Sequence, residues 1–371
     1  MHIIIDRLTL EAALEVVNKF VDARPLNSIL ENAVVTAEKD NTVTVRAGNT
    51  DTQAVFIIKD GAECKVPGTI LLPGKPLYDS VKEMPDGNIE MKIRDGANLI
   101  DITWPNGGCM FPCYKDEYPA TKDPEEQDAT EFTTSCAILC RGLRSTIYAV
   151  SKDELRPQLE TVFIENDENL QFTGTNGRLL AHSGTPDGNK HKKGTMLMPM
   201  NVAEKLVKML PDDETPVTVR ADKKRISVMT ENITVSTFNQ TANYPNYKSV
   251  FPKEFTTHIT VNKDSLSRAI RRILPYSATT TVILQIEDGK LNLAAENTNT
   301  KAKIKETLEA QVTGEHVNTA FNGDNLLETL KNIKGEAANI SLNGPNKAAL
   351  ISGSEDDGFE EKTVIMPVMI S

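Results

Sequence analysis

The sequence repeats one pattern three times along its length. His2, Phe132 and His258 each open a short run of alternating residues that leads into an amphipathic helical pattern. Phe132 lies 130 residues after His2, and His258 lies 126 residues after Phe132. Repeats longer than ~50 residues indicate repeated domains rather than the short units of a solenoid. We therefore expect three similar domains, and a chain built in this way usually acts through its shape.

The pattern continues inside each repeat. After the first helix come two β-rich runs joined by a polar turn, which is typical of a hairpin. A further strand leads into a second amphipathic helix, and more alternating strands close the repeat. These strand-and-helix segments are residues 68–84, 194–210 and 317–333. The order predicts an α+β fold with antiparallel sheets in each domain.

Two segments mark boundaries between the repeats. Residues 117–130 are acidic and proline-rich, as expected of a linker, and residues 242–255 hold the same place after the second repeat. A length of 371 residues is compatible with two or three domains. Together these features predict domains at residues 1–127, 128–254 and 255–371.

The composition is that of a soluble globular protein, with 39% hydrophobic and 25% charged residues. No apolar run approaches the ~18 residues of a membrane span. The first residues, "MHIIIDRLTLEAAL", lack the basic region and cleavage site of a signal peptide. Five cysteines, an odd number without a secretion signal, indicate reduced thiols. We expect a cytoplasmic protein that does not bind membranes.

The sequence offers little catalytic or metal-binding chemistry. Its five histidines are scattered, and no Ser/His/Asp set has a recognisable local context. Cys109 and Cys113, like Cys136 and Cys140, have three residues between them but lack further ligands at a zinc spacing. Cys136 and Cys140 lie one turn apart on a predicted helix, where buried thiols are expected. We therefore predict no metal, no cofactor and no enzymatic activity.

Basic residues gather on single faces of several predicted helices. The net charge of −11 argues against a protein that coats nucleic acid generally. Residues three or four apart on a helix share a side. By this spacing the basic sets are Arg141 with Arg144, Lys205 with Lys208, and Arg268 with Arg271 and Arg272. Any one set could be a solvated helix face, and the first helix of the chain is slightly acidic. The recurrence at equivalent helices still favours a segregated basic surface.

A head-to-tail pair of such chains could enclose a duplex. A circle of about twelve helices packed ~8–10 Å apart has a diameter of roughly 30–40 Å through the helix axes. Removing about one helix radius on each side leaves roughly 20–30 Å, which is comparable with the width of a nucleic-acid duplex.

Four motifs, in order, resemble those of one known family. They are "RPLNSIL" (residues 24–30), "GTNGRLLA" (174–181), "NYPNYKSVFP" (243–252) and "TVIMPVMIS" (363–371). Each is moderately specific, but four at matching places in a threefold repeat are together strong. The chain resembles the bacterial replicative sliding clamp family, the beta subunit of DNA polymerase III, over its whole length.

The resemblance implies a head-to-tail homodimeric ring of six similar domains, with helices lining the hole and antiparallel sheets outside. Such a clamp slides on double-stranded DNA and tethers the replicative polymerase without catalysing a reaction. An ATP-driven clamp loader places it on primed DNA. Lysine and arginine side chains facing phosphates would attract the backbone without sequence preference.

The resemblance also implies a pocket, between the second and third domains, for the linear peptide that polymerase, loader and repair proteins carry. Arg178 takes the place of the family's histidine and Leu179 that of its arginine, so peptide preference is expected to differ. Ordinary strand core and linker are the alternative reading of these residues. The expected floor and rim are Leu159, Thr175, Gly177, Arg178, Leu179, Leu180, Pro245, Val250, Val364, Met366, Pro367 and Val368.

Two further surfaces are expected. Arg24 is carried over by its motif as a DNA contact, and the helix faces add Arg141, Arg144, Lys205, Lys208, Arg268, Arg271 and Arg272. For the dimer seam the family uses a strand of domain one against a helix of domain three. The corresponding residues are Cys109 and Phe111 on the strand and Ile273 and Leu274 on the helix, with interior packing as the alternative.

Two other classes of protein remain open at this point. A β-rich module that binds peptides without enclosing DNA would show no difference between circular and linear DNA. An enzyme with an active site between repeats would need a cleft of titratable groups with shifted pKa values. The threefold repeat, the missing chemistry and the ordered motifs favour the clamp.

Overall fold

In each repeat a strand runs directly into a helix, as the sequence predicts. The first such pairs are β1 (His2–Asp6) with α1 (Arg7–Asn18), β10 (Thr130–Ser135) with α3 (Cys136–Ile147), and β18 (Thr257–Asn262) with α5 (Lys263–Ile273). The second are β6 (Gly68–Pro73) with α2 (Gly74–Lys82), β14 (Gly194–Pro199) with α4 (Met200–Met209), and β23 (Val317–Asn322) with α6 (Gly323–Asn332).

Short polar side chains at the strand ends start several of these helices. Asp6 Oδ2 accepts a hydrogen bond from Thr9 N at 2.9 Å. Asn262 caps α5 and Asn322 caps α6 in the same way, each at 2.9 Å. Such N-caps satisfy backbone N–H groups that the first helical turn leaves free.

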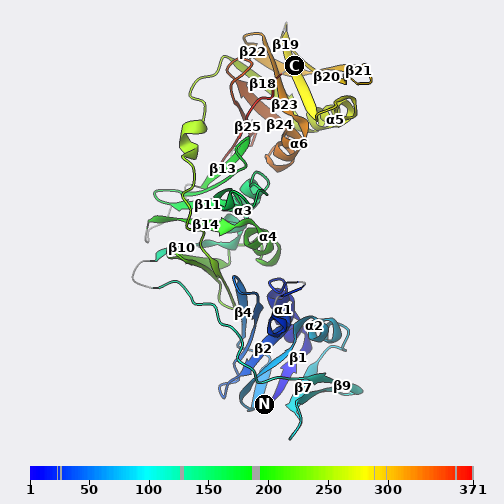
Figure 1. The fold of residues 1–371 in the computed structure, drawn as a ribbon, viewed down its shortest axis with the longest axis vertical. Coiled ribbons are helices and arrows are strands. Elements are labelled where there is room, and N and C mark those ends of the chain that lie inside the picture. Colours follow the sequence, from blue (N-terminus) through cyan, green and yellow to red (C-terminus); the bar gives the residue numbers. More distant parts are fainter. Residues whose placement is uncertain are drawn as a thin grey trace. The chain divides into compact units, whose positions relative to one another are not determined.

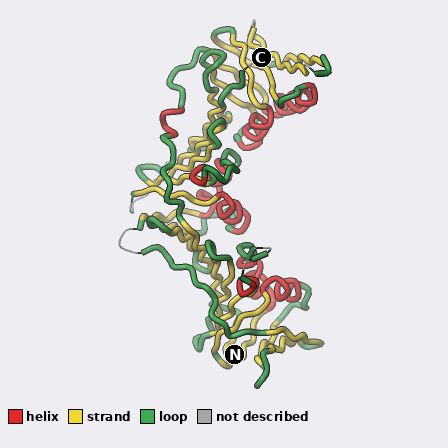
Figure 2. The backbone as a smooth tube through the Cα atoms, in the orientation of Figure 1, coloured by secondary structure: helices red, strands yellow, loops and turns green. Residues whose placement is uncertain are grey.

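The computed structural model describes residues 1–22, 24–25, 27–125, 129–185, 193–287, 289–297, 299–355 and 357–369. The chain forms two units, the first of Met1–Cys136 with Lys208–Asn239 and the second of Ala137–Val207 with Gln240–Ser371. Figure 1 traces the elements in chain order. Figure 2 shows α1 and α2 of the first unit lying together beside its strands.

The first unit contains two antiparallel sheets. The five-stranded sheet has the order β5 (Ala62–Val66), β1, β7 (Asn88–Ile93), β8 (Leu99–Trp104), β9 (Gly107–Pro112). The eight-stranded sheet has the order β10, β15 (Pro216–Ala221), β16 (Arg225–Met229), β17 (Ile233–Phe238), β4 (Gln53–Ile58), β3 (Val43–Gly48), β2 (Asn32–Ala37), β6.

The second unit also contains two antiparallel sheets. The nine-stranded sheet has the order β14, β11 (Thr161–Asn166), β12 (Leu170–Thr175), β13 (Leu179–Thr185), β26 (Glu360–Ile365), β25 (Ala349–Gly353), β24 (Ala337–Leu342), β18, β22 (Ala310–Gly314). The four-stranded sheet has the order β21 (Ala302–Leu308), β20 (Lys290–Asn297), β19 (Thr281–Glu287), β23.

The expected hairpin of each repeat is followed by a strand that the sequence analysis missed. These third strands are β4, β13 and β21. β4 pairs with β17, and β13 pairs with β26, so each joins two repeats into one continuous sheet. The two units therefore cut across the middle repeat, and the domain boundaries at 127 and 254 remain a prediction.

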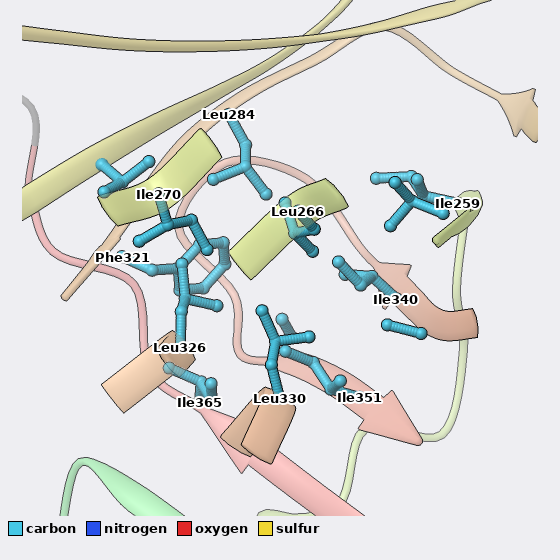
Figure 3. Packing of buried hydrophobic residues seen from close by; sticks show 14 of the residues in the cluster. Ile259, Leu266, Ile270, Leu284, Phe321, Leu326, Leu330, Ile340, Ile351 and Ile365 are labelled. Atoms are coloured by element: carbon cyan, nitrogen blue, oxygen red, sulfur yellow. The ribbon is translucent and has the colours of Figure 1, made fainter. Parts of the chain in front are cut away.

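Apolar side chains of α5 and α6 fill the core of the second unit. Figure 3 shows Leu266 and Ile270 of α5 close to Leu326 and Leu330 of α6, with strand residues such as Ile340 beside them. All of these side chains are almost completely buried. Cys136 and Cys140 are buried residues of α3, as predicted.

Close packing in the second unit depends on a glycine in α3. A Cβ atom on Gly142 would lie 2.3 Å from ring carbons of Phe172, which is fully buried. We expect Gly142→Ala to lower the melting temperature by about 2–6 °C, although alanine favours helices, because the ring must shift. Thermal unfolding by circular dichroism measures this. Gly184→Ala is the matched control, since its Cβ meets nothing closer than 3.8 Å; an equal loss in both variants would contradict the packing argument.

Candidate binding surfaces

Several residues expected in a peptide pocket lie where β13 pairs with β26. Leu180 faces Val364 across the two strands. Both side chains are buried together with Tyr247 of the linker segment. Phe163 and Leu350 pack against this cluster from β11 and β25. Strand pairing thus brings distant parts of the sequence into one apolar floor.

Leu179 does not belong to that floor. Successive side chains of a strand point to opposite faces of the sheet. Leu179 therefore packs into the helix-covered core with Ala181 and Ile365, whereas Leu180 faces the linker. The leucine found in place of the family's arginine therefore packs on the core side of the sheet.

A hydrogen-bonded turn fixes the rim beside Leu179. Asn176 Oδ1 accepts hydrogen bonds from Arg178 N and Leu179 N, each at 2.9 Å. Thr175 Oγ1 donates to Leu179 O at 2.7 Å and accepts from Gly177 N at 3.1 Å. Gly177 has φ +89°, a conformation that favours glycine. The turn presents Arg178 to solvent.

The end of the chain lies along the same rim. Met366 N donates to Arg178 O at 2.9 Å, which extends the β13–β26 ladder by one pair. Val368 N donates to Ala320 O at 2.8 Å. Pro367 and Val368 are half-buried, whereas Met366 is 43% exposed.

Apolar side chains are exposed around this floor. Val250, at the end of η3 (Tyr247–Val250), is 42% exposed, and Met369 is 92% exposed. Leu159 and Thr175 are buried, and Pro245 is exposed. Leu155, which the sequence analysis did not select, is 90% exposed. Contiguous exposed apolar side chains mark interaction surfaces, so these residues are candidates for one.

Leu155 is held in place rather than hanging free. Its backbone N–H donates to Asp153 Oδ1 at 3.1 Å, and Arg156 Nε donates to Asp153 Oδ2 at 2.9 Å. Ser151 N donates to Leu159 O at 2.9 Å and closes the loop. The sequence did contain a signal for this residue, because a leucine directly after Asp153 and Glu154 stands out in an otherwise polar loop.

Aromatic rings bind the linker segment to the sheet. Tyr244 stacks on Phe163 with ring centroids 4.7 Å apart. The Tyr247 hydroxyl lies 3.0 Å from both Glu165 Oε2 and Gln171 Oε1. Burial raises the pKa of both tyrosines, so they remain neutral. The segment is thereby fixed over the β11–β12–β13 face.

His182 lies beneath these rings. Its ring centroid is 5.6 Å from that of Tyr247 and 5.7 Å from that of Phe251. Burial lowers the pKa of His182 from 6.5 to about 4, and the nearby charges of Glu360, Lys362, Lys248 and Glu165 partly cancel. The imidazole is therefore neutral at pH 7.

Arg141, an expected DNA contact, is engaged in an ionic network. Its guanidinium donates two hydrogen bonds to Asp357, at 2.7 and 2.8 Å, and one to Glu361 at 2.9 Å. It also stacks on Phe359 at 3.6 Å. The hydrogen bonds from Arg141 are the main reason that the pKa of Asp357 lies well below its usual range. Arg141 joins α3 to the segment before β26, a role that helix spacing alone does not reveal.

The remaining basic residues differ in their surroundings. On α5, Arg268 and Arg271 are exposed opposite a buried apolar face, as predicted. Arg272 donates from Nε to Glu306 at 3.0 Å. Arg24, Arg144 and Lys208 are exposed, and Lys205 is half-buried.

The residues expected at a dimer seam also differ in how deeply they are buried. Cys109 and Phe111 are half-buried on β9, an edge strand of its sheet. Ile273 is fully buried in the core of its own unit, which fits the interior-packing alternative. Leu274 packs half-buried against that core.

The part of the chain that the structure describes contains no group of three His, Cys, Asp or Glu side chains that could hold a metal ion. Among the same residues, no helix is long and apolar enough to cross a membrane.

Two family models match the chain. Residues 1–103 match the N-terminal domain of the DNA polymerase III beta subunit, and residues 248–369 match its C-terminal domain. The beta sliding clamp of Halalkalibacterium halodurans is 25% identical over 96% of this chain and 97% of its own length. That of Bacillus subtilis is 24% identical over 99% of each chain.

Solved structures share the fold over the full length of both chains. The beta subunit from Streptococcus pyogenes has a TM-score of 0.92 at 21% identity. A Pseudomonas aeruginosa sliding clamp, solved bound to griselimycin, has a TM-score of 0.91 at 21% identity. The chain therefore belongs to the DNA polymerase III beta-subunit family, the bacterial sliding clamps.

The neutral, half-buried His182 predicts a pH-dependent stability. The folded protein resists protonation until about pH 4, whereas the unfolded chain binds the proton near pH 6.5. This contribution is present above pH 6.5 and is lost as the pH falls. We expect about 2 kcal/mol less stability at pH 5 than at pH 7 from this group. Urea unfolding at both pH values measures it, and His182→Gln should reduce the difference. An unchanged difference in that variant would contradict the assignment to His182.

Proposed function

We propose that this chain is a DNA sliding clamp, a homodimeric ring that encircles duplex DNA and acts as a processivity factor. One observation carries the proposal. The pairing between neighbouring repeats, β4 with β17 and β13 with β26, occurs twice, and the corresponding strands β21 and β9 remain at the edges of their sheets. As a sliding clamp the protein tethers a polymerase and is not an enzyme. We propose a cytoplasmic location, where the clamp loader and polymerase act.

The two junctions within the chain share one register. Val55 of β4 faces Thr234 of β17, and His182 of β13 faces Lys362 of β26. Residues can be matched between repeats by counting through the paired strands. The count starts at the second helix of each repeat for the strands β4 and β13, and at the first helix for the strands β17 and β26. By this count Val55 and His182 are equivalent, and so are Thr234 and Lys362.

The same count identifies the third pair. Lys305 of β21 is equivalent to His182, and Gly108 of β9 is equivalent to Lys362. β21 and β9 both lie at the edge of their sheets. We infer that Lys305 faces Gly108 of the partner subunit, which places Ile304 opposite the partner's Cys109 and Ala302 opposite the partner's Phe111.

Burial supports this pairing. Ala54 and Ala181, which are equivalent to Ile304, are buried by their neighbouring strands, as are Val235 and Thr363, which are equivalent to Cys109. Ile304 itself is only half-buried. A second copy would cover the apolar surface that the other junctions cover internally. Two such seams, related by twofold symmetry, close a ring.

The exposed basic residues fit a surface that slides. Lysine and arginine contacts to phosphates hold the backbone without reading bases. We propose Arg24, Arg144, Lys205, Lys208, Arg268, Arg271 and Arg272 as DNA contacts. Arg141 and Arg272 take a smaller part in the proposal because nearby carboxylates already compensate their charges.

We also propose that the apolar floor of Leu180 and Val364 binds the linear peptide of the polymerase, the loader and other partners. The exposed Val250 and Met366 at its margin support this role, and Leu155 joins them. Apolar walls with a few fixed polar groups are what anchored peptides require.

Retention on circular DNA tests the clamp function. The protein is loaded on a nicked circle with a matching clamp loader and ATP, and the bound fraction is measured before and after one restriction cut. We expect the protein to remain on the circle and to leave the linear product, because its link to DNA is topological. Protein that survives the cut unchanged would bind by contact and would favour the peptide-binding module.

A cysteine cross-link tests the seam. Asn232 O accepts from Ile57 N and Arg178 O from Met366 N, so these pairs are hydrogen-bonded. By alternation, the Ile304–Cys109 pair is not hydrogen-bonded, and its Cα atoms should lie ~4.5 Å apart. That separation suits a disulfide. We therefore expect Ile304→Cys to form a covalent dimer through the partner's Cys109 on oxidation, seen on a non-reducing gel.

Lys305→Cys is the matched control for the cross-link. Its side chain leaves the opposite face of β21 and meets a glycine, so it should cross-link no more than the unmodified protein. Equal yields from the two variants, or none from Ile304→Cys, would reject the register.

A further inference from the structure

A second hollow lies beside the proposed peptide floor, on the same face of the sheet. It has a volume of about 370 Å³. Its walls are the rings of His182, Tyr247, Phe251 and Phe255, with Pro252 and Leu350 completing the apolar lining. None of these residues was selected by the sequence analysis. The hollow shares Tyr247, Phe251 and Leu350 with the cluster around Leu180 and Val364, but neither Leu180 nor Val364 lines it.

The two sites are adjacent along the strands. His182 lies two residues beyond Leu180 on β13, and Lys362 lies two residues before Val364 on β26. Residues two apart share a face and are ~7 Å apart. Tyr247 touches Leu180 and Val364 on one side and His182 on the other. An extended chain lying on the floor therefore reaches the hollow within two or three residues.

The chemistry of the hollow favours an uncharged aromatic side chain. The ring of Tyr247 meets that of Phe251 edge to face at 6.4 Å, as the ring of His182 does at 5.7 Å. In this arrangement other edges and faces of the rings remain available to pack against a further aromatic ring. Gln171 and three charged residues complete the lining, and these charges are already paired. Lys248 Nζ lies 2.8 Å from Glu165 Oε2, and Lys362 pairs with Glu360. A charged guest would find no free partner among them.

We propose that this hollow receives an uncharged aromatic side chain from the flank of the same clamp-binding peptide. The proposal rests on the proposed peptide floor. The volume is at the lower end of the ~300–1,000 Å³ found for ligand sites, which suits one side chain rather than a cofactor. The hollow thus adds a second anchor that distinguishes peptides with a flanking aromatic residue from those without one.

Peptides of different length test the proposal on the full-length protein. The probe is a short clamp-binding peptide from the replicative polymerase of the same organism, measured by fluorescence anisotropy. It is compared with versions lengthened by Gly-Gly-Phe, at one end or the other, and by Gly-Gly-Ala as their controls. Three extended residues span ~10 Å, which is enough to reach the hollow. We expect one Phe extension to bind about five- to tenfold more tightly than its Ala control.

Two variants of the protein show whether the gain in affinity comes from the hollow. Phe255→Ala removes one wall of the hollow but no member of the Leu180 cluster, so it should abolish the gain and leave the short peptide's affinity unchanged. Tyr114→Ala removes a partly exposed ring from the other unit and should change neither affinity.

The possible failures are distinct. If the short peptide binds but neither Phe extension gains affinity, or if the gain survives Phe255→Ala, the second anchor is rejected and the peptide floor stands. If the short peptide itself does not bind, the peptide floor fails, and the second anchor fails with it. Retention on circular DNA tests the clamp independently of both outcomes.

Discussion

The structure depends on antiparallel pairing between strands of different repeats. β4 with β17 and β13 with β26 turn separate repeats into continuous sheets, and backbone hydrogen bonds fix their register. Each pairing also fixes what lies on either face: helices and core on one, a linker on the other. The position of Leu180 toward the linker and Leu179 toward the core follows from this register. The proposed seam and the proposed peptide floor both derive from it.

The two linkers are held to their junctions by different chemistry. At the first, Gln53 donates to Pro119 O at 2.6 Å and accepts from Thr121 N at 3.1 Å, and Asp123 accepts from Ser227 and Ser236. At the second, stacked aromatic rings are added to a few polar contacts of the tyrosine hydroxyls. Polar contacts satisfy each other and offer little apolar surface to a partner. The aromatic linker leaves apolar surface open, which fits the proposed peptide site at the second junction.

Much of the architecture could be predicted from the sequence, because its signals are local. The strand-to-helix repeat and the buried side of α5 follow from periodicity. The third strands were missed because β4 and β13 gain their stability from partners over a hundred residues away. The partners of Arg141 were hidden for the same reason, since Asp357 lies 216 residues further along the chain. The hollow beside His182 could not be predicted, because it depends on the register of the paired strands, which composition does not reveal.

The open strand edges give the ring a second consequence, which concerns solubility. An unpaired edge can pair with any extended chain and so promotes aggregation. β21 carries Lys303 and Lys305, charges that discourage unintended pairing, but β9 (Gly107–Pro112) has no charged residue and exposes half of Met110. A separated subunit therefore exposes this uncharged edge to unintended pairing. Ring closure shields that strand, so a clamp that stays dimeric also stays soluble.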